Sequence, residues 1–475
     1  MNVAYMGYIA QELKQWGVIT ELAKFYSVSR QFIYTLINTF KAIMPQLFSP
    51  QRKEESISKK ELFSKMLSYR MEGRCSIEAI SSLMQRDKLA LSSVGMISQT
   101  LSSIGKLLPS NIESNITTPI ELMVASDEIF SKSIPILITV DPISSTILSI
   151  KKAESRKGEE WKKHYDELKE NGFSIRGVVR DEGNGLGLGA KESIPNAIYQ
   201  VDTYHAIAHR LGLLVEKFDK QAYRIIEVQE KSKNKEAHQK KLESHIELSD
   251  NFRYLYHCII HQLKPFKHTG EIREKQEAKE EIETALELME TLNTTAITTE
   301  IKSIRKILAN LLNYFEQTTQ VLKDCQSLNL TQYELQNLCL EWQWEKALIK
   351  AKVQSRRNQA REQIKFYQAF NQELLQERYT TMKETIFKKL ETIIQASSMV
   401  ETINSILRPY LNNSKNQVTQ SFLNLFMFYH NHRRYRAGKR KGKTPMELLT
   451  HTKQERDWIE LLVKEIESKD KNFFI

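Results

Sequence analysis

Three acidic residues stand where a site for two metal ions would need them. Asp127 ends the apolar run ELMVASD, Asp181 ends the run SIRGVVRD, and Glu401 lies far downstream in SSMVETINSILRPYL. Mg²⁺ prefers oxygen ligands in near-octahedral geometry, so carboxylates that converge from separate elements suit it. Two such ions about 4 Å apart stabilise both the attacking and the leaving oxygen of a phosphoryl transfer. The three positions therefore predict metal-dependent chemistry on a phosphate ester.

The two aspartates follow strand-like sequence. A carboxylate within an apolar strand is costly unless it is paired or bound to a metal. Asp181 precedes the glycine-rich segment EGNGLGLGA, and we expect these glycines to let a substrate backbone approach closely. The segment contains no GxxxxGK[ST] pattern, which argues against nucleotide binding. Glu128 and Glu182 adjoin the two aspartates and could assist them or be the ligands in their place.

Glu401 has two competing interpretations. Ser398 and Glu401 form the pattern of a capping box, in which the glutamate closes onto the backbone of the cap residue. Asn404 and Arg408 follow at i+3 and i+7, which places all three polar side chains on one helix face. A carboxylate aligned with an amide and a guanidinium suits a metal beside a phosphate backbone. This arrangement favours the interpretation of Glu401 as a metal ligand over that of a helix cap.

Other acidic residues and histidines carry weaker signals. Asp141 precedes Pro142 between two predicted strands, so a turn residue is the better interpretation. Asp202, His205 and His209 fall at i, i+3 and i+7 on one predicted helix face. Three ligands on one helix without a cysteine are a weak indication of a transition-metal site.

Strand patterns precede a long helical region. Apolar runs predict strands at 121–130, 133–142, 145–154, 174–181 and 196–202, with a helix at 158–172. This order predicts an α/β core, a mixed five-stranded sheet covered by helices. Residues 205–395 carry dense Glu and Lys at helical spacing, which is typical of solvated helix faces. We expect an all-helical insertion there, which either clamps DNA or mediates dimerisation.

Residues 19–38 follow the helix-turn-helix template. Ser27 stands at a tight turn where glycine is preferred, and Ser29 is a good N-cap for the second helix. Arg30, Gln31 and Tyr34 would project outward, where side chains reach base edges or phosphates. An ordinary helical hairpin with the same core spacing is the alternative.

Residues 59–108 are also helical by periodicity, either as a second, degenerate helix-turn-helix or as a connector packed on the first unit. Ser92 or Ser93 is expected to cap the last helix. The predicted domains are an N-terminal helix-turn-helix, a second helical unit, the first part of the core, the insertion, and the last part of the core. Their ranges are 1–50, 51–110, 111–210, 211–390 and 391–475.

Composition limits the class of protein. A formal charge of +11 and a pI near 9.1 make a polyanionic partner plausible. Sixteen glycines and ten prolines are few, which indicates a helix-rich chain. Four widely spaced cysteines form no CxxC pair, which suits a reducing compartment. The N-terminal segment lacks a signal-peptide pattern, and no apolar run is long enough to cross a bilayer. We therefore expect a cytoplasmic protein with no membrane partner.

The order of these features resembles the DDE transposases of bacterial insertion sequences. The most specific segments are VVRDEGNGL, DTYHAIAHRL, SSMVETINSILRPYL and FLNLFMFYHNHRRYRAGKRKGKTPMELL. The last is similar to the C-terminal end of many transposases and integrases. The segment from Asp202 to His205 resembles a C/D-x-x-H element of Mutator-like transposases, whose long insertion between the second and third acids is also similar.

The resemblance implies a catalytic domain with an RNase H-like fold and a two-metal mechanism. It makes Asp127, Asp181 and Glu401 the metal-binding catalytic carboxylates, with two Mg²⁺ ions that Mn²⁺ could replace. It implies DNA as the partner, both transposon ends and target, and at least a homodimer on DNA. On this interpretation Asn404 and Arg408 contact DNA, and the basic string 432–443 holds phosphates. The string's predicted contact residues are Arg433, Arg434, Arg436, Lys439 and Arg440.

Other classes of protein stay open. A helix-turn-helix regulator, or a transposase that has lost catalysis and only binds DNA, would share the N-terminal signal. A coiled-coil interaction protein would explain 205–395 but not the aspartates at strand ends. The basic string could also be a solubilising loop.

Overall fold

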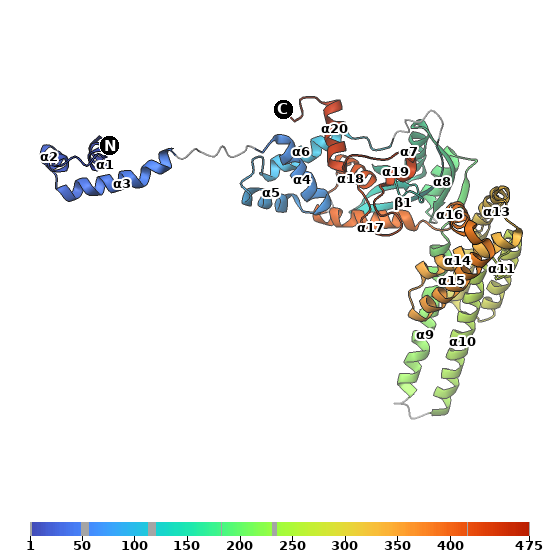
Figure 1. Cartoon of the computed structure of the whole chain (residues 1–475). Helices are drawn as coiled ribbons and strands as arrows, with labels where there is room; N and C mark the ends of the chain where they lie inside the picture. Colours follow the sequence, from blue (N-terminus) through green and yellow to red (C-terminus); the bar gives the residue numbers. More distant parts are fainter. Residues whose placement is uncertain are drawn as a thin grey trace. The chain divides into compact units, whose positions relative to one another are not determined.

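The computed structural model describes residues 2–48, 57–112, 120–181, 183–229, 235–415 and 417–474. The chain forms two compact units, Met1–Glu61 and Leu62–Ile475 (Figure 1). Glu182, a possible ligand in the sequence, lies outside the described residues. Within the described ranges, no helix is both long enough and apolar enough to cross a membrane.

The N-terminal unit is a bundle of three helices, α1 (Asn2–Glu12), α2 (Val18–Phe25) and α3 (Arg30–Phe48). Ser29 caps α3 as expected, because its hydroxyl accepts the Phe32 amide at 3.1 Å. Ser27 adopts a φ of 55°, the left-handed conformation that explains why glycine is preferred at this turn. Ile33 and Ile37 form the buried face of α3 and pack in the small core of this three-helix unit.

A single mixed sheet forms the centre of the second unit. Its strands lie in the order β3-β2-β1-β4-β5. β1 pairs antiparallel with β2 and parallel with β4; β2–β3 is antiparallel and β4–β5 parallel. The bounds are β1 (Ile120–Ser131), β2 (Ile134–Val140), β3 (Ile147–Lys152), β4 (Phe173–Arg180) and β5 (Ile198–Val201). The expected α/β core with five strands is therefore present.

The pleat of β1 divides its side chains between the two faces of the sheet. Leu122 and Val124 pack in the cluster formed with α7 (Gly158–Glu170) and α8 (Asn184–Ser193). Ala125 and Ile129 pack in the other cluster, with α17 (Ser398–Asn413) and α18 (Gln420–His432). Successive strand residues face opposite sides, so Asp127 shares the face of α17.

The glycines after Asp181 have a different role from the one expected. They lie mostly within α8, and a Cβ at Gly185 would meet the Arg156 carbonyl oxygen at 1.9 Å. A Cβ at Gly189 would meet Trp161 Cβ at 2.5 Å. These glycines let α7 and α8 pack closely, and the prediction that they admit a substrate backbone was wrong for both positions.

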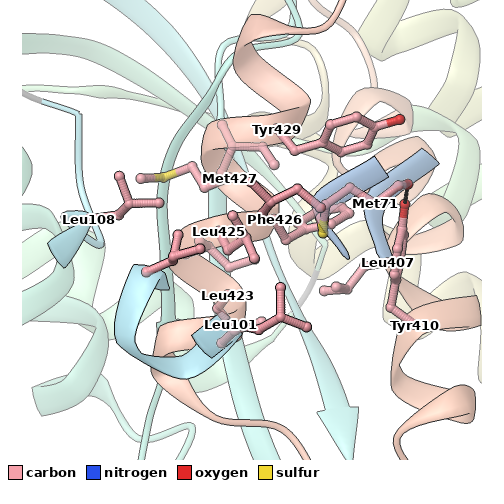
Figure 2. Packing of buried hydrophobic residues seen from close by; sticks show 14 of the residues in the cluster. Met71, Leu101, Leu108, Leu407, Tyr410, Leu423, Leu425, Phe426, Met427 and Tyr429 are labelled. Atoms are coloured by element: carbon pink, nitrogen blue, oxygen red, sulfur yellow. Dashed lines mark hydrogen bonds between the residues drawn. The ribbon is translucent and has the colours of Figure 1, made fainter. Parts of the chain in front are cut away.

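Four helical elements precede the sheet and, from Leu62 on, belong to the same unit: α4 (Lys59–Leu67), η1 (Ser68–Glu72), α5 (Ile77–Arg86) and α6 (Val94–Leu107). Ser93 caps α6 at 3.2 Å from the Met96 amide. The Tyr410 hydroxyl donates to the Met71 carbonyl at 2.5 Å, and Leu101 lies in the same cluster as Phe426 (Figure 2). From Leu62 on, these helices pack in one cluster with α17 and α18, so their partner is the core of the second unit rather than the N-terminal unit on which a connector was expected to pack.

The segment between β5 and α17 consists of helices joined by short turns and loops in its described residues, with one isolated bridge between Phe266 and Ile272, and has its own hydrophobic cluster. In Figure 1, α9 and α10 run side by side as a long pair. The bounds are η2 (Tyr204–His209), α9 (Arg210–Gln229), α10 (Lys235–Gln262), α11 (Lys275–Glu290), α12 (Thr295–Leu311), α13 (Tyr314–Cys325), η3 (Gln326–Leu328), α14 (Gln332–Lys350), α15 (Gln354–Leu375), η4 (Gln376–Arg378) and α16 (Tyr379–Leu390).

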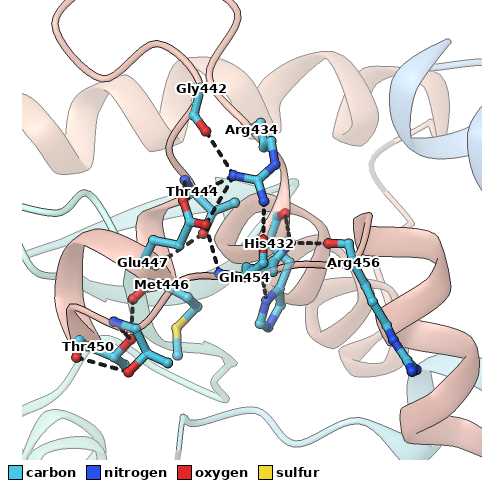
Figure 3. Close-up of polar contacts among 10 residues, drawn as sticks. His432, Arg434, Gly442, Thr444, Met446, Glu447, Thr450, Gln454 and Arg456 are labelled. Atoms are coloured by element: carbon cyan, nitrogen blue, oxygen red, sulfur yellow. Dashed lines mark hydrogen bonds and ion pairs between the residues drawn. The ribbon is translucent and has the colours of Figure 1, made fainter.

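After α18 the chain forms a basic loop and two helices, α19 (Pro445–Thr450) and α20 (Trp458–Lys469). Arg434 donates to both carboxylate oxygens of Glu447, at 3.0 and 3.1 Å, and to the Gly442 carbonyl at 2.8 Å (Figure 3). It also donates to the Gln454 carbonyl. Arg434 therefore closes the loop onto α19.

Candidate functional site

Two of the predicted acids lie beside each other because their strands are neighbours. Ala125 of β1 pairs with Val179 of β4 in parallel register. Continuing that register by two residues brings Asp127 next to Asp181, which directly follows β4. Parallel neighbours lie about 4.8 Å apart, so the two carboxylates share one edge of the sheet.

Asp202 continues this row on the third parallel strand. Arg180 pairs with Val201, so the residues that follow them, Asp181 and Asp202, stand side by side. Asp202 is 1% exposed and precedes η2, which corrects the expectation that it shares a helix face with His205 and His209. Asp127, within β1, and Asp181 and Asp202, which directly follow β4 and β5, thus form a row of three aspartates across the sheet.

The Asp202 carboxylate is fully engaged within the protein. One oxygen accepts the backbone amides of Tyr204 at 2.7 Å and His205 at 3.0 Å. The other accepts both the amide and the hydroxyl of Ser397 at 2.7 Å. Since Ser397 directly precedes α17, Asp202 ties the start of that helix to the end of β5. We assign Asp202 a positioning role.

Glu401 does not form the capping box that its sequence allows. The N-cap is Ser397 rather than Ser398, and its side chain makes no cap hydrogen bond. The Glu401 carboxylate reaches across to Nε2 of His205 instead. The box fails because the helix begins at Ser398, which places Glu401 one position beyond N3, and its carboxylate binds His205 instead.

Several carboxylates lie close together at this site, and their negative charges affect one another's pKa values. Burial and, next, the negative charge of Asp181 raise the pKa of the Asp127 carboxyl to about 7, and the charges of Glu128 and Glu401 contribute less. Burial alone would lower the pKa of His205. The hydrogen bond to Glu401 and the charge of Asp202 outweigh this effect and raise it.

Asn404 links α17 to the central strand. Its amide nitrogen donates to Asp127 Oδ2 at 2.7 Å, from a side chain that is 6% exposed. The amide oxygen of the same side chain is buried and has no hydrogen-bond partner among the described residues. An unsatisfied oxygen beside a carboxylate whose pKa is raised is a place where a cation would be stabilised.

A cavity of about 530 Å³ joins these groups. It brings together the three acids predicted from the sequence. Asn404 and Arg408, on the same face of α17, line it as well, and Arg210 adds a second guanidinium from the insertion side. The lining residues are Asp127, Asp181, Gly183, Val201, Asp202, His205, Ala206, His209, Arg210, Ser397, Glu401, Asn404, Ser405 and Arg408.

Two other acidic residues considered in the sequence, Glu128 and Asp141, do not line this cavity. Glu128 points to the opposite face of β1 from Asp127, and its carboxylate lies 3.6 Å from Arg156. Asp141 holds the turn between β2 and β3, where it accepts the amides of Ile143 at 3.2 Å and Ser144 at 2.8 Å. The interpretation of Asp141 as a turn residue is confirmed.

Two donor sets for a cation share Glu401. Ligand atoms of Asp202, His205 and Glu401 lie within 4.8 Å of one another. Both Asp202 oxygens already accept two hydrogen bonds each, so that set has little capacity left for a metal. Asp127, Asp181 and Glu401 supply only oxygen ligands, the donors that Mg²⁺ prefers.

The predicted DNA-binding residues of the N-terminal unit are on its surface. Arg30, Gln31 and Tyr34 are all exposed along the first turns of α3, and Tyr34 retains 44% of its accessible surface. Gln31 lies on the side of the helix away from the buried Ile33 and Ile37, whereas Arg30 and Tyr34 flank that buried face. Their contact with DNA stays a prediction.

The predicted phosphate contacts in the basic loop fall into two groups. Arg434 and Arg440 are used inside the fold: Arg434 holds Glu447, and Arg440 donates to the Ile143 carbonyl at 2.6 Å. Arg433 lies over the Tyr429 ring at 5.5 Å. Arg436 and Lys439 are exposed, so within the predicted set they are the side chains most open to a phosphate.

Two hydrogen-bonded links that build the site have no local signal in the sequence. The link from Asp202 to Ser397 spans 195 residues, and the bond from Asn404 to Asp127 spans 277. The sequence singled out Asp202 through its spacing to His205 and His209 and through the C/D-x-x-H resemblance, but neither signal points to Ser397. Arg210 had no signal, because one arginine in a charged helix is unremarkable.

Comparisons with known proteins add no family. No protein-family model matches the chain, and no curated protein sequence matches it at a significant level. The site is therefore interpreted from its own geometry.

Proposed function

We propose that this protein is a DNA transposase that cleaves and transfers strands at transposon ends by metal-dependent phosphoryl transfer. One observation carries the proposal: Asp127, Asp181 and Glu401, from β1, the end of β4 and α17, line a single cavity. Carboxylates that converge from three separate elements are what a two-metal site requires.

The arrangement of the sheet supports an RNase H-like core. Three antiparallel strands are followed by two parallel strands in the order β3-β2-β1-β4-β5. The first acid is on the central strand, the second on its parallel neighbour, and the third on a helix that packs against β1. A helical insertion between the second and third acids also agrees with the resemblance to DDE transposases.

The residues present fit a pair of Mg²⁺ ions, with Mn²⁺ as a substitute. Asp127, Asp181 and Glu401 would hold them, and the unsatisfied Asn404 oxygen adds a neutral donor beside Asp127. When bound, the ions would activate the attacking hydroxyl and stabilise the leaving 3′-oxygen. Cation binding would also relieve the repulsion that raises the pKa of Asp127.

The chain's own side chains supply positioning. Asn404 fixes the orientation of the Asp127 carboxylate through its 2.7 Å hydrogen bond. Asp202 anchors the start of α17 and thereby the position of Glu401. Arg408 and Arg210 line the cavity and would neutralise the phosphate that undergoes transfer. Positioning of this kind lowers the barrier because the reacting groups are already oriented.

The remaining surfaces provide DNA binding. Arg30, Gln31 and Tyr34 would read the transposon end from α3, and the exposed Arg436 and Lys439 would hold phosphates nonspecifically. Two ends must be processed together, so we propose a homodimer or larger assembly on DNA. The proposed location is the cytoplasm of a bacterial cell, at the nucleoid when DNA is bound.

The test is cleavage of DNA carrying the element's own ends in Mg²⁺, comparing unaltered protein, Asp181→Asn and the control Glu128→Gln. Asp181→Asn should lower nicking at the ends by more than about a thousandfold, because it removes one of three ligands and its charge. Glu128→Gln should cleave normally, because Glu128 faces the other side of β1. End binding without cleavage by any of the proteins would replace this proposal with a DNA-binding regulator or an inactive transposase.

A further inference from the structure

The turn between α14 and α15 concentrates positive charge. From Lys346 to Lys365 the sequence contains seven basic residues and one acidic residue, Glu362. Two of the seven have partners in the protein: Lys346 pairs with Glu391, and Arg356 lies 3.5 Å from a nitrogen of His257. The other five form what we call the α14–α15 basic surface: Lys350, Lys352, Arg357, Arg361 and Lys365.

The side chains of this surface are exposed and have no ion-pair partner in the part of the chain that the structure describes. Arg357, Arg361 and Lys365 recur at i, i+4 and i+8, so they form one ridge about 12 Å long. Ala360 and Asn371 mark the buried side of α15, where it packs on α14. The ridge flanks this packed side and is free for a partner.

The rest of the insertion has the opposite bias. α11 contains six glutamates and two lysines. Several insertion arginines elsewhere are used in ion pairs, as Arg305 is with Glu283 (3.0 Å) and Glu290 (2.8 Å). Charge in this lobe is therefore segregated rather than spread evenly. A polyanion would be attracted to the α14–α15 side and repelled by α11.

The α14 end of the basic surface lies near the segment that leads to the candidate site. Lys346, near the end of α14, and Lys439 of the basic loop both approach Glu391, the latter at 3.5 Å. Glu391 begins the segment that leads to α17, and within it the Gln395 carbonyl accepts the Thr203 amide at 3.0 Å.

We infer that the α14–α15 basic surface binds the phosphate backbone of duplex DNA as it extends away from the catalytic cavity. The inference rests on the proposed function, because that function makes DNA the molecule in the cavity. Arginines in a row at exposed positions suit phosphate oxygens, which accept paired hydrogen bonds from a guanidinium. Such contacts add affinity without sequence preference. The helical insertion thereby becomes a DNA clamp.

The experiment measures binding of the full-length protein to a duplex of mixed sequence in EDTA, over a series of salt concentrations. The test variant is Arg357→Ala/Arg361→Ala, and the control is Lys279→Ala/Lys323→Ala on α11 and α13 of the same lobe. Each removes two positive charges from surface helix positions. The test variant should bind more weakly, and its slope of log K against log salt should be shallower by about 2. The control should keep the slope of the unaltered protein.

Unfolding temperatures of both variants are measured to confirm that binding, and not folding, has changed. An unchanged slope in a folded Arg357→Ala/Arg361→Ala variant would overturn the inference and point to another partner, such as an acidic protein. Metal-dependent cleavage that still depends on Asp181 would then leave the proposed function in place. Normal binding of the duplex without any cleavage would contradict the proposed function and leave the inference about the basic surface in place.

Discussion

In the helical insertion, the buried carboxylate of Glu341 accepts hydrogen bonds from three side chains. These are Asn371 at 2.7 Å, Tyr379 at 2.8 Å and Lys383 at 2.5 Å. In the α/β core, the Asp127 carboxylate lies instead among other carboxylates, and its pKa is raised to about 7. In the insertion, hydrogen-bond donors and a lysine compensate the buried negative charge, whereas in the core several negative charges lie close together. Compensation serves stability, whereas accumulation costs stability and suits a site that gains a cation.

The largest effect is expected from Lys383→Met in the insertion. The variant leaves Glu341, which is fully buried, without its cationic partner. Removing one member of a buried pair typically costs about 3–5 kcal/mol, and because Lys383 is partly exposed we expect a loss of about 2–3 kcal/mol. Chemical denaturation followed by circular dichroism measures this loss.

Lys388→Met is the matched control, since Lys388 is an exposed lysine on the same helix, α16. It should change the free energy of unfolding by no more than about 0.5 kcal/mol. Equal stability of the two variants would contradict the view that the insertion depends on its compensated charge.

The second effect is smaller and has the opposite sign. Asp127→Asn should stabilise the metal-free protein at pH 8 by about 1–2 kcal/mol, because it removes a carboxylate whose ionisation is penalised in the folded state. The folded pKa of about 7 lies above the unfolded value of 3.8. The folded protein binds the Asp127 proton more tightly than the unfolded chain does. The stabilisation that results is fully present below pH 3.8 and is lost as the pH rises through 7. The difference between the variant and the unaltered protein should accordingly shrink toward about pH 4.

Melting temperatures in EDTA at pH 8 and pH 5, with and without added Mg²⁺, test this expectation. Mg²⁺ should raise the melting temperature of the unaltered protein and have little effect on Asp127→Asn. A variant that is less stable than the unaltered protein at pH 8 would mean that Asp127 is compensated like Glu341.

The same contrast explains what the sequence could predict. Apolar runs that end in Asp127 and Asp181 predicted the sheet and two of the residues that line the cavity. This was possible because the periodicity of a run and the polar residue that closes it can be read directly from the sequence. Glu401 was ambiguous, since the capping box is a local pattern and its His205 partner is 196 residues away. The Asp202–Ser397 link and the packing of α8 glycines on α7 depend on tertiary contacts that no local pattern encodes. The basic string 432–443 showed its charge in the sequence but not the internal use of Arg434.

The smallest effect is expected at a solvent-exposed pair of the insertion, Lys275 and Glu316. Their side chains meet at 2.5 Å between α11 and α13, but Glu316 keeps 59% of its side-chain exposure. Water and salt screen such pairs, so Glu316→Gln should cost no more than about 0.5 kcal/mol. Lys275 also donates to Asn313 at 2.7 Å, and that bond remains in the variant. Denaturation at low and at high salt measures the cost, and any difference from the unaltered protein should vanish at high salt. A loss of stability as large as that of Lys383→Met would show that an exposed ion pair stabilises the insertion as much as a buried one, and would contradict the role given to burial.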